Sequence, residues 1–140
     1  MCALKSGSKL IHQYLKIADN IRRYIIIVDD EKDILDLFQE ALEMKGLRVK
    51  TFLDPCEALS HIQKDLQLCS LIITDIRMPE MSGIEFVQRV RKISSDIKII
   101  FMTAFEMEKG QIKEMDTIEL LRKPIRLENL ITMVTKVLEM

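Results

Sequence analysis

The segment spanning residues 71–75, with the sequence Leu-Ile-Ile-Thr-Asp, is the feature that most constrains the fold of this chain. An apolar run ends in a single acid, Asp75, and Pro79 follows four residues later. Short apolar runs bounded by turn signals are typical of buried strands, often in parallel sheets. Asp75 is therefore predicted at the carboxyl end of a strand, the edge where open α/β sheets bind their ligands. By itself such a carboxylate is either a reactive group or an ordinary loop acid.

The same pattern recurs along the chain and predicts five strands, at residues 24–28, 48–53, 71–75, 98–102 and 118–121. Polar residues stand at or just beyond the carboxyl ends of four of them: Asp29 and Asp30 after the first, Asp75 at the third, Thr103 after the fourth and Lys123 after the fifth. Because parallel strands end at one edge of a sheet, these side chains are expected to gather there.

Apolar residues at helical spacing separate the strands and predict helices at about 34–44, 55–66, 83–90, 106–115 and 127–138. Helix-end signals support them: Gly46 after the first, Asp54-Pro55 before the second and a Ser82-to-Glu85 capping box at the third. The helix near 106–115 contains Gly110 and is expected to be weak. Five strands alternating with five helices predict an α/β fold, a doubly wound parallel sheet with helices on both faces.

The N-terminal residues are distinct from this pattern. Apolar residues recur at helical spacing from Lys9 to Arg22, which predicts a basic amphipathic helix. Residues 1–23 hold five cations and one acid, a formal charge of +4; since the chain totals −1, the rest carries −5. We expect an extension over residues 1–22 and one domain over 23–140. The favoured interpretation is an extra helix that covers the domain or forms a dimer; the alternative is binding to a membrane surface or a partner.

Composition excludes several classes of protein. A length of 140 residues suits one domain, and a net charge of −1 gives no general attraction to nucleic acid. Cys2, Cys56 and Cys69 are odd in number and lack C-x-x-C spacing, which argues against a disulfide framework or zinc site. No apolar stretch approaches the roughly 20 residues of a membrane span. The expected location is the cytoplasm, whose reducing conditions suit free cysteines.

The ordered set formed by Asp29-Asp30, residues 74–79 with Gly83, residues 102–104 and Lys123-Pro124 resembles the receiver domain of two-component response regulators. The resemblance extends over about residues 23–139. It implies a flavodoxin-like sheet with strand order 2-1-3-4-5, here with an extra N-terminal helix.

An acidic pocket follows from the positions of Asp29, Asp30 and Asp75. Crowded carboxylates repel one another unless a cation sits among them, and an oxygen-lined pocket with room for water suits Mg²⁺. The resemblance implies that Asp30, Asp75 and the backbone carbonyl of Arg77 contact the metal, with Asp29 acting mainly through water. The alternative is that Asp29 and Asp30 merely cap the next helix.

The resemblance also makes Asp75 the phosphoacceptor, with Lys123 and Thr103 contacting the phosphoryl oxygens. In this family the Lys-Pro peptide bond, here Lys123-Pro124, is commonly cis. Phosphate is expected to draw Thr103 inward and shift the segment beyond it. Receivers usually carry an aromatic residue three positions before the lysine; this chain has Leu120 there, so the resemblance does not imply the aromatic-flip part of the switch.

Two further residues are expected near the pocket, and the histidines away from it. Arg77 and Phe105, two positions beyond Asp75 and Thr103, either fill loops or tune the lifetime of the phosphoryl group; we expect bulky Phe105 to shield it from water. His12 and His61 are expected on the surface, away from the acidic pocket.

The protein is predicted to be a phosphoacceptor. It would receive its phosphoryl group from a histidine kinase or histidine phosphotransfer protein and signal to an effector protein. It is not expected to be an enzyme, although it assists its own phosphorylation and dephosphorylation. We expect a receiver of the stand-alone type, without an output domain, and therefore no direct DNA binding. A homodimer through the last two strand–helix units or the N-terminal helix is possible.

Two other functional classes compete with the phosphoacceptor. A receiver-like scaffold that binds partners without phosphorylation is the alternative function. A phosphatase of the haloacid-dehalogenase type requires a second acid two residues beyond the nucleophile, and Arg77 occupies that position. The phosphatase is therefore rejected.

Overall fold

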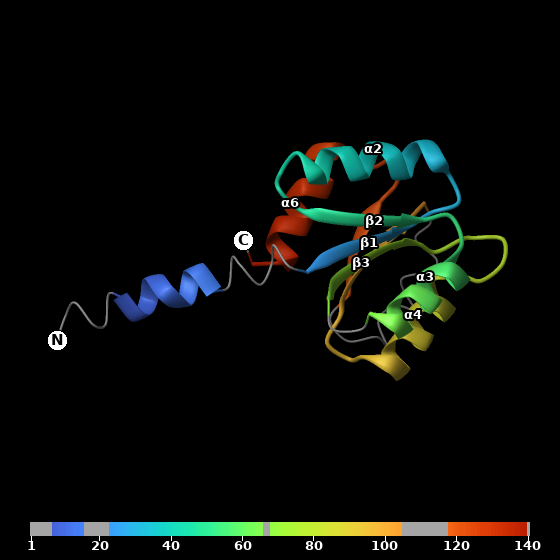
Figure 1. Cartoon of the computed structure of the whole chain (residues 1–140). Coiled ribbons are helices and arrows are strands. Elements are labelled where there is room, and N and C mark those ends of the chain that lie inside the picture. The colour runs from blue at the N-terminus through green and yellow to red at the C-terminus, as the bar shows by residue number, and fades with distance from the viewer. Residues whose placement is uncertain (1–6, 16–22, 66–67, 105–117, 140) are drawn as a thin grey trace.

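The computed structural model describes residues 7–15, 23–65, 68–104 and 118–139 (Figure 1). Five parallel strands form one sheet in the order β2-β1-β3-β4-β5, which confirms the predicted topology. The strands are β1 (Tyr24–Val28), β2 (Arg48–Phe52), β3 (Cys69–Asp75), β4 (Lys98–Thr103) and β5 (Ile118–Arg122). Each begins and ends within two residues of its predicted position.

Helices cover both faces of the sheet. They are α2 (Lys32–Glu43), α3 (Pro55–Lys64), α4 (Gly83–Ile93) and α6 (Leu127–Val137). Helices α2 and α6 lie on one face, and α3 and α4 lie on the other (Figure 1). The helix predicted near 106–115 lies outside the described residues.

The interior strand β1 shows why the sheet is covered on both sides. All five of its residues are buried, and successive side chains point to opposite faces. Ile26 and Val28 pack in the core under α3 and α4, whereas Ile25 and Ile27 pack in the core under α2 and α6. The continuous β-branched run therefore anchors two separate cores.

The predicted helix-end signals take their expected forms. The Asp54 carboxylate accepts the N–H of Cys56 at 2.8 Å at the start of α3, and Pro55 is the first helical residue. The Ser82 hydroxyl accepts the N–H of Glu85 at 3.1 Å at the start of α4. Gly46, after α2, has φ +82°, a conformation in which glycine carries little steric cost.

The N-terminal helix, described over residues 7–15, does not cover the domain. Figure 1 shows it standing apart from the sheet and its helices. The apolar side chains of Leu10, Ile11, Tyr14 and Leu15 are 58–71% exposed. Over residues 7–15 the helix therefore does not cover the domain, and the interpretation that it forms a dimer stays a prediction.

Among the helices of the described ranges, none is long and apolar enough to cross a membrane.

Candidate functional site

Strand register brings the predicted polar residues to one edge of the sheet. Val28 of β1 lies opposite Thr74 of β3, so Asp29 and Asp75 both emerge one residue later. On the other side of β3, Asp75 lies opposite Met102, which directly precedes Thr103. Thr103 in turn lies opposite Arg122, so that Lys123 leaves β5 at the same edge.

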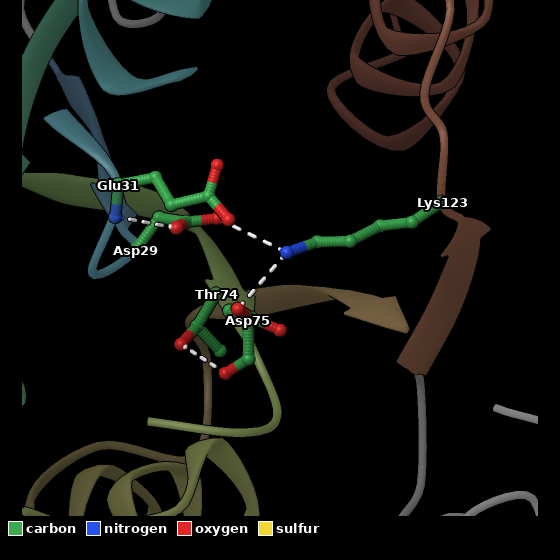
Figure 2. Close-up of polar contacts among 5 residues, drawn as sticks. All are labelled: Asp29, Glu31, Thr74, Asp75 and Lys123. Carbon is green, nitrogen blue, oxygen red and sulfur yellow. Dashed lines mark hydrogen bonds and ion pairs between the residues drawn. The ribbon is translucent and has the colours of Figure 1, made fainter. Parts of the chain in front are cut away.

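Lys123 joins two carboxylates at this edge (Figure 2). Its ammonium nitrogen lies 2.9 Å from Oδ2 of Asp75 and 3.4 Å from Oδ2 of Asp29. The backbone N–H of Lys123 also donates to the Thr103 carbonyl at 2.8 Å, which fixes the start of this side chain against β4. The Lys123-Pro124 peptide bond is cis, as the resemblance implied.

Asp29 is the more buried of the two paired acids, with no solvent exposure. Burial, together with the charge of Asp75, raises the pKa of Asp29 to about 6, although the Glu31 N–H at 2.9 Å and Lys123 oppose the shift. Burial alone would lower the pKa of Lys123, but its hydrogen bond to Asp75 and the charge of Asp29 raise that pKa. The pocket therefore holds more negative charge than one ammonium fully compensates.

The acid cluster fits a hard divalent cation. Asp29, Asp30 and Asp75 each offer a carboxylate oxygen within 4.8 Å of the other two. Asp30 is exposed, whereas Asp29 and Asp75 are buried, so the cluster opens to solvent on one side. Mg²⁺ retains several waters and takes few protein ligands, which suits this arrangement. The Arg77 carbonyl follows β3 by two residues, and its part in metal binding stays a prediction.

The capping alternative is partly right. Asp29 does accept a backbone N–H, from Glu31 just before α2. Glu31 is the N-cap residue of α2, directly before the helix, and its own side chain makes no capping hydrogen bond. Asp29 thus stabilises the turn into α2 with one oxygen and pairs with Lys123 through the other.

Thr103 is buried and Leu120 is partly buried. Thr103, at the end of β4, is 5% exposed. Leu120 packs against the core under α3 and α4, opposite Phe101 in the sheet register. Phe105 lies outside the described residues, so its proposed shielding of a phosphoryl group stays a prediction.

Two features that hold Asp75 in place were not deduced from the sequence. The Thr74 hydroxyl donates to the Asp75 carbonyl at 2.9 Å. The N–H of Gly83 donates to the Ile76 carbonyl at 2.7 Å, and a Cβ at Gly83 would overlap the Asp75 carbonyl oxygen. The glycine in the motif was visible in the sequence, but only the fold shows that it lets α4 begin against the backbone of Asp75.

The two histidines differ from each other. His12 is exposed, as expected. His61 is instead partly buried: its ring lies 5.6 Å from that of Tyr24 and 5.5 Å from that of Phe52, and Lys50 Nζ lies 3.1 Å from its Nε2. The expectation of a simple surface residue is wrong for His61, because α3 turns it toward β1 and β2.

Comparisons with known proteins agree with this geometry. Response regulator SaeR of Staphylococcus aureus is 31% identical over 122 residues, which cover 81% of this chain and 52% of that protein. SaeR of Staphylococcus epidermidis is 38% identical over 89 residues, covering 64% of this chain and 38% of that protein. The chain thus spans about half or less of the length of these curated relatives.

Solved structures show the same fold. Chemotaxis protein CheY4 of Vibrio cholerae superposes with a TM-score of 0.75 at 31% identity, covering 82% of this chain and 98% of that one. A response regulator receiver domain protein of Clostridium thermocellum gives a TM-score of 0.76 at 25% identity, covering 84% and 94%. The family described as the response regulator receiver domain matches residues 25–135. With the five-stranded sheet and the acid–lysine cluster at its carboxyl edge, this match shows that the chain belongs to the receiver domain family of two-component response regulators.

Proposed function

We propose that this receiver domain accepts a phosphoryl group from a phosphohistidine donor onto the carboxylate of Asp75 and signals to a protein partner. The observation that supports the proposal most is the contact between Lys123 and Asp75, with Asp29 and Asp30 beside them. A buried carboxylate paired with one ammonium and flanked by further acids is a poor arrangement for stability alone. It is a suitable arrangement for a reaction that brings negative charge and a cation to the same place.

The reaction is an in-line phosphoryl transfer. A carboxylate oxygen of Asp75 attacks the phosphorus, the bond between phosphorus and the donor imidazole nitrogen breaks, and that imidazole takes up a proton. Phosphoryl transfer depends mainly on positioning and charge stabilisation. Lys123 offsets charge on the phosphoryl oxygens, and the hydroxyl of Thr103 donates a hydrogen bond to one of them.

Asp29, Asp30 and Asp75, with the Arg77 carbonyl, would hold Mg²⁺ in this pocket. The bound ion supplies positive charge to the transferring phosphoryl group. Asp29 needs such a cation most, because its burial raises its pKa to about 6 and makes its ionised form costly.

Signalling follows from the change in charge at Asp75. We propose that the phosphoryl group draws Thr103 toward it and that the segment beyond β4 shifts in response. Leu120 replaces the usual aromatic residue, so this step would proceed without an aromatic flip. The partners that fit this role are a histidine kinase or histidine phosphotransfer protein upstream and an effector protein downstream, in the cytoplasm. The domain acts on no separate substrate and assists only its own phosphorylation and dephosphorylation.

Intact-protein mass spectrometry tests the proposal. The protein is incubated with Mg²⁺ and acetyl phosphate, beside an Asp75→Asn variant and a sample containing EDTA. One added phosphoryl group on the wild-type protein alone is the expected result. If neither acetyl phosphate nor a histidine-phosphorylated donor protein modifies the wild-type protein, the phosphoacceptor proposal fails and the scaffold function takes its place.

A further inference from the structure

The N-terminal helix carries an apolar stripe that its own chain leaves open. The stripe consists of Leu10, Ile11, Tyr14 and Leu15. The first two lie three or four residues before the last two, so all four share one side of the helix. Their exposed fractions, between 58% and 71%, exceed those of the exposed leucines of the body, Leu37, Leu53 and Leu68; among the described apolar residues of the body, Met44 is more exposed, at 80%. Water contact with four large apolar side chains on one helix is unfavourable and favours a partner surface.

The distribution of charge along the chain indicates which kind of partner surface fits the helix. The N-terminal segment, residues 1–23, carries a formal charge of +4; Lys9 lies on the described helix and the other cations flank it, so two such segments repel each other. The rest of the chain carries −5, so an anionic membrane would attract the helix but repel the body. A protein surface that is both acidic and apolar complements the basic charge of the segment and the apolar stripe of the helix.

Among the described helices of the body, α2 has this character. Four acids and one lysine give α2 a formal charge of −3, whereas α3 and α6 are neutral and α4 carries +2. The acids surround two exposed apolar side chains, Leu37 at 46% and Met44 at 80% exposure. We call the exposed residues that share this side of the helix the acidic face of α2: Asp33, Asp36, Leu37, Glu40, Glu43 and Met44.

We propose that the N-terminal helix of one chain binds the acidic face of α2 in a second copy of the chain. The helix stands apart from α2 of its own chain (Figure 1), so its stripe is available to another molecule. Each chain carries both a helix and an acidic face, so two copies exchange helices and form two equivalent contacts in a closed two-fold dimer. This pairing does not depend on phosphorylation of Asp75.

Three full-length double variants test the proposal. A helix variant, Leu10→Ser with Tyr14→Ser, removes half of the stripe. A face variant, Leu37→Ser with Glu40→Lys, alters the acidic face at exposed positions. The matched control, Leu53→Ser with Glu57→Lys, makes the same changes at exposed positions outside α2. Circular dichroism confirms that each variant is folded.

Sedimentation velocity over a range of protein concentrations gives the dimer dissociation constant. We expect the wild-type protein and the control to dimerise with constants that agree within about twofold, and the helix and face variants to weaken dimerisation about tenfold or more. Raising the salt from low to high concentration should weaken the wild-type dimer several-fold, because exposed charges are screened.

Mixing the helix variant with the face variant is the most specific test. That pair retains one intact helix and one intact acidic face, so the heterodimer should be tighter than the homodimer of either variant. A wild-type protein that is monomeric at every concentration would overturn the proposal. A dimer that the face variant leaves unchanged, or that the control weakens equally, would overturn it as well.

Discussion

The ammonium of Lys123 lies 2.9 Å from a carboxylate oxygen of Asp75, a residue 48 positions earlier in the chain. The two side chains meet because β3 and β5 flank β4 in a parallel sheet and end at the same edge. This contact places a fixed positive charge beside the carboxylate that we propose as the phosphoacceptor.

Replacing Lys123 tests the role of that charge. In a Lys123→Gln variant the phosphoryl oxygens lose a cation close to Asp75. We expect phosphorylation by acetyl phosphate to slow by about 100-fold, in line with the loss of one strong electrostatic contact in a transition state. Time-resolved intact mass measures the rate. Lys32→Gln, at an exposed lysine of α2, is the matched control and should leave the rate unchanged.

Replacing Asp29 tests the cost of its burial. Its pKa is raised from 3.8 to about 6, so between these values the folded protein binds more protons than the unfolded chain. The free energy of unfolding therefore falls as the pH rises through this window and stays low above it. At pH 7.5 without Mg²⁺ we expect Asp29→Asn to raise the free energy of unfolding by about 1–3 kcal/mol, measured by urea denaturation.

Two controls accompany the Asp29 measurement. Asp30→Asn, at an exposed position, should change the free energy of unfolding by much less. Added Mg²⁺ should stabilise the wild-type protein more than Asp29→Asn, because binding offsets the repulsion in the pocket. An Asp29→Asn variant less stable than wild type would show that the Lys123 ion pair outweighs the cost of burial.

Gly83 tests how closely α4 approaches the site. A Cβ there would overlap the Asp75 carbonyl oxygen and lie 3.0 Å from the Ile76 Cα, so the backbone must move. We expect Gly83→Ala to cost about 1–3 kcal/mol of stability and also to slow phosphorylation. Thermal unfolding and intact mass measure the two effects. Gly7→Ala, where a Cβ meets nothing within 4 Å, should change neither.

His61 predicts a pH dependence remote from the site. Burial and then Lys50 lower the pKa of His61, while Asp65 raises it and Lys64 lowers it less strongly. The unfolded chain therefore binds a proton near pH 6.5 that the folded protein resists, and stability contributed by His61 is lost as the pH falls below that value. His61→Phe keeps a ring against Tyr24 and Phe52 and should reduce this loss.

The free energy of unfolding of wild type and of His61→Phe is measured at pH 7.5 and at pH 5.5. Between the two pH values the variant should lose less stability than wild type. His12→Phe, at an exposed histidine, is the matched control. A difference that is independent of pH would contradict the assigned environment of His61.

The sequence was enough to predict the strands and to place the candidate site residues at one edge of the sheet, and the resemblance to receiver domains implied the strand order. Apolar runs of β-branched residues mark buried strands, and a charged residue that ends such a run must lie at the sheet edge. The positions of Asp29, Asp75 and Lys123 follow from this rule, and the strand ends agree within two residues. Local signals such as Asp54 before Pro55 are equally visible, because caps depend on neighbouring residues alone.

Features that depend on distant contacts were harder to predict. Asp29 and Asp30 are adjacent acids, but only the packing of β2 and β3 around β1 determines that Asp29 is buried and Asp30 is exposed. The approach of Gly83 to Asp75 requires the path of the loop between β3 and α4. The amphipathic pattern of the N-terminal helix predicted its apolar side correctly but gave no information on what covers that side.

Identifying the side chain that carries the phosphoryl group tests the central claim most directly. After incubation with Mg²⁺ and acetyl phosphate, the protein is treated with sodium borohydride, which reduces an aspartyl phosphate to homoserine, and its peptides are sequenced by mass spectrometry. We predict homoserine at position 75 and unchanged aspartate at positions 29 and 30. Homoserine at position 29 or 30, or a phosphoryl group found on a side chain other than Asp75, would contradict the account.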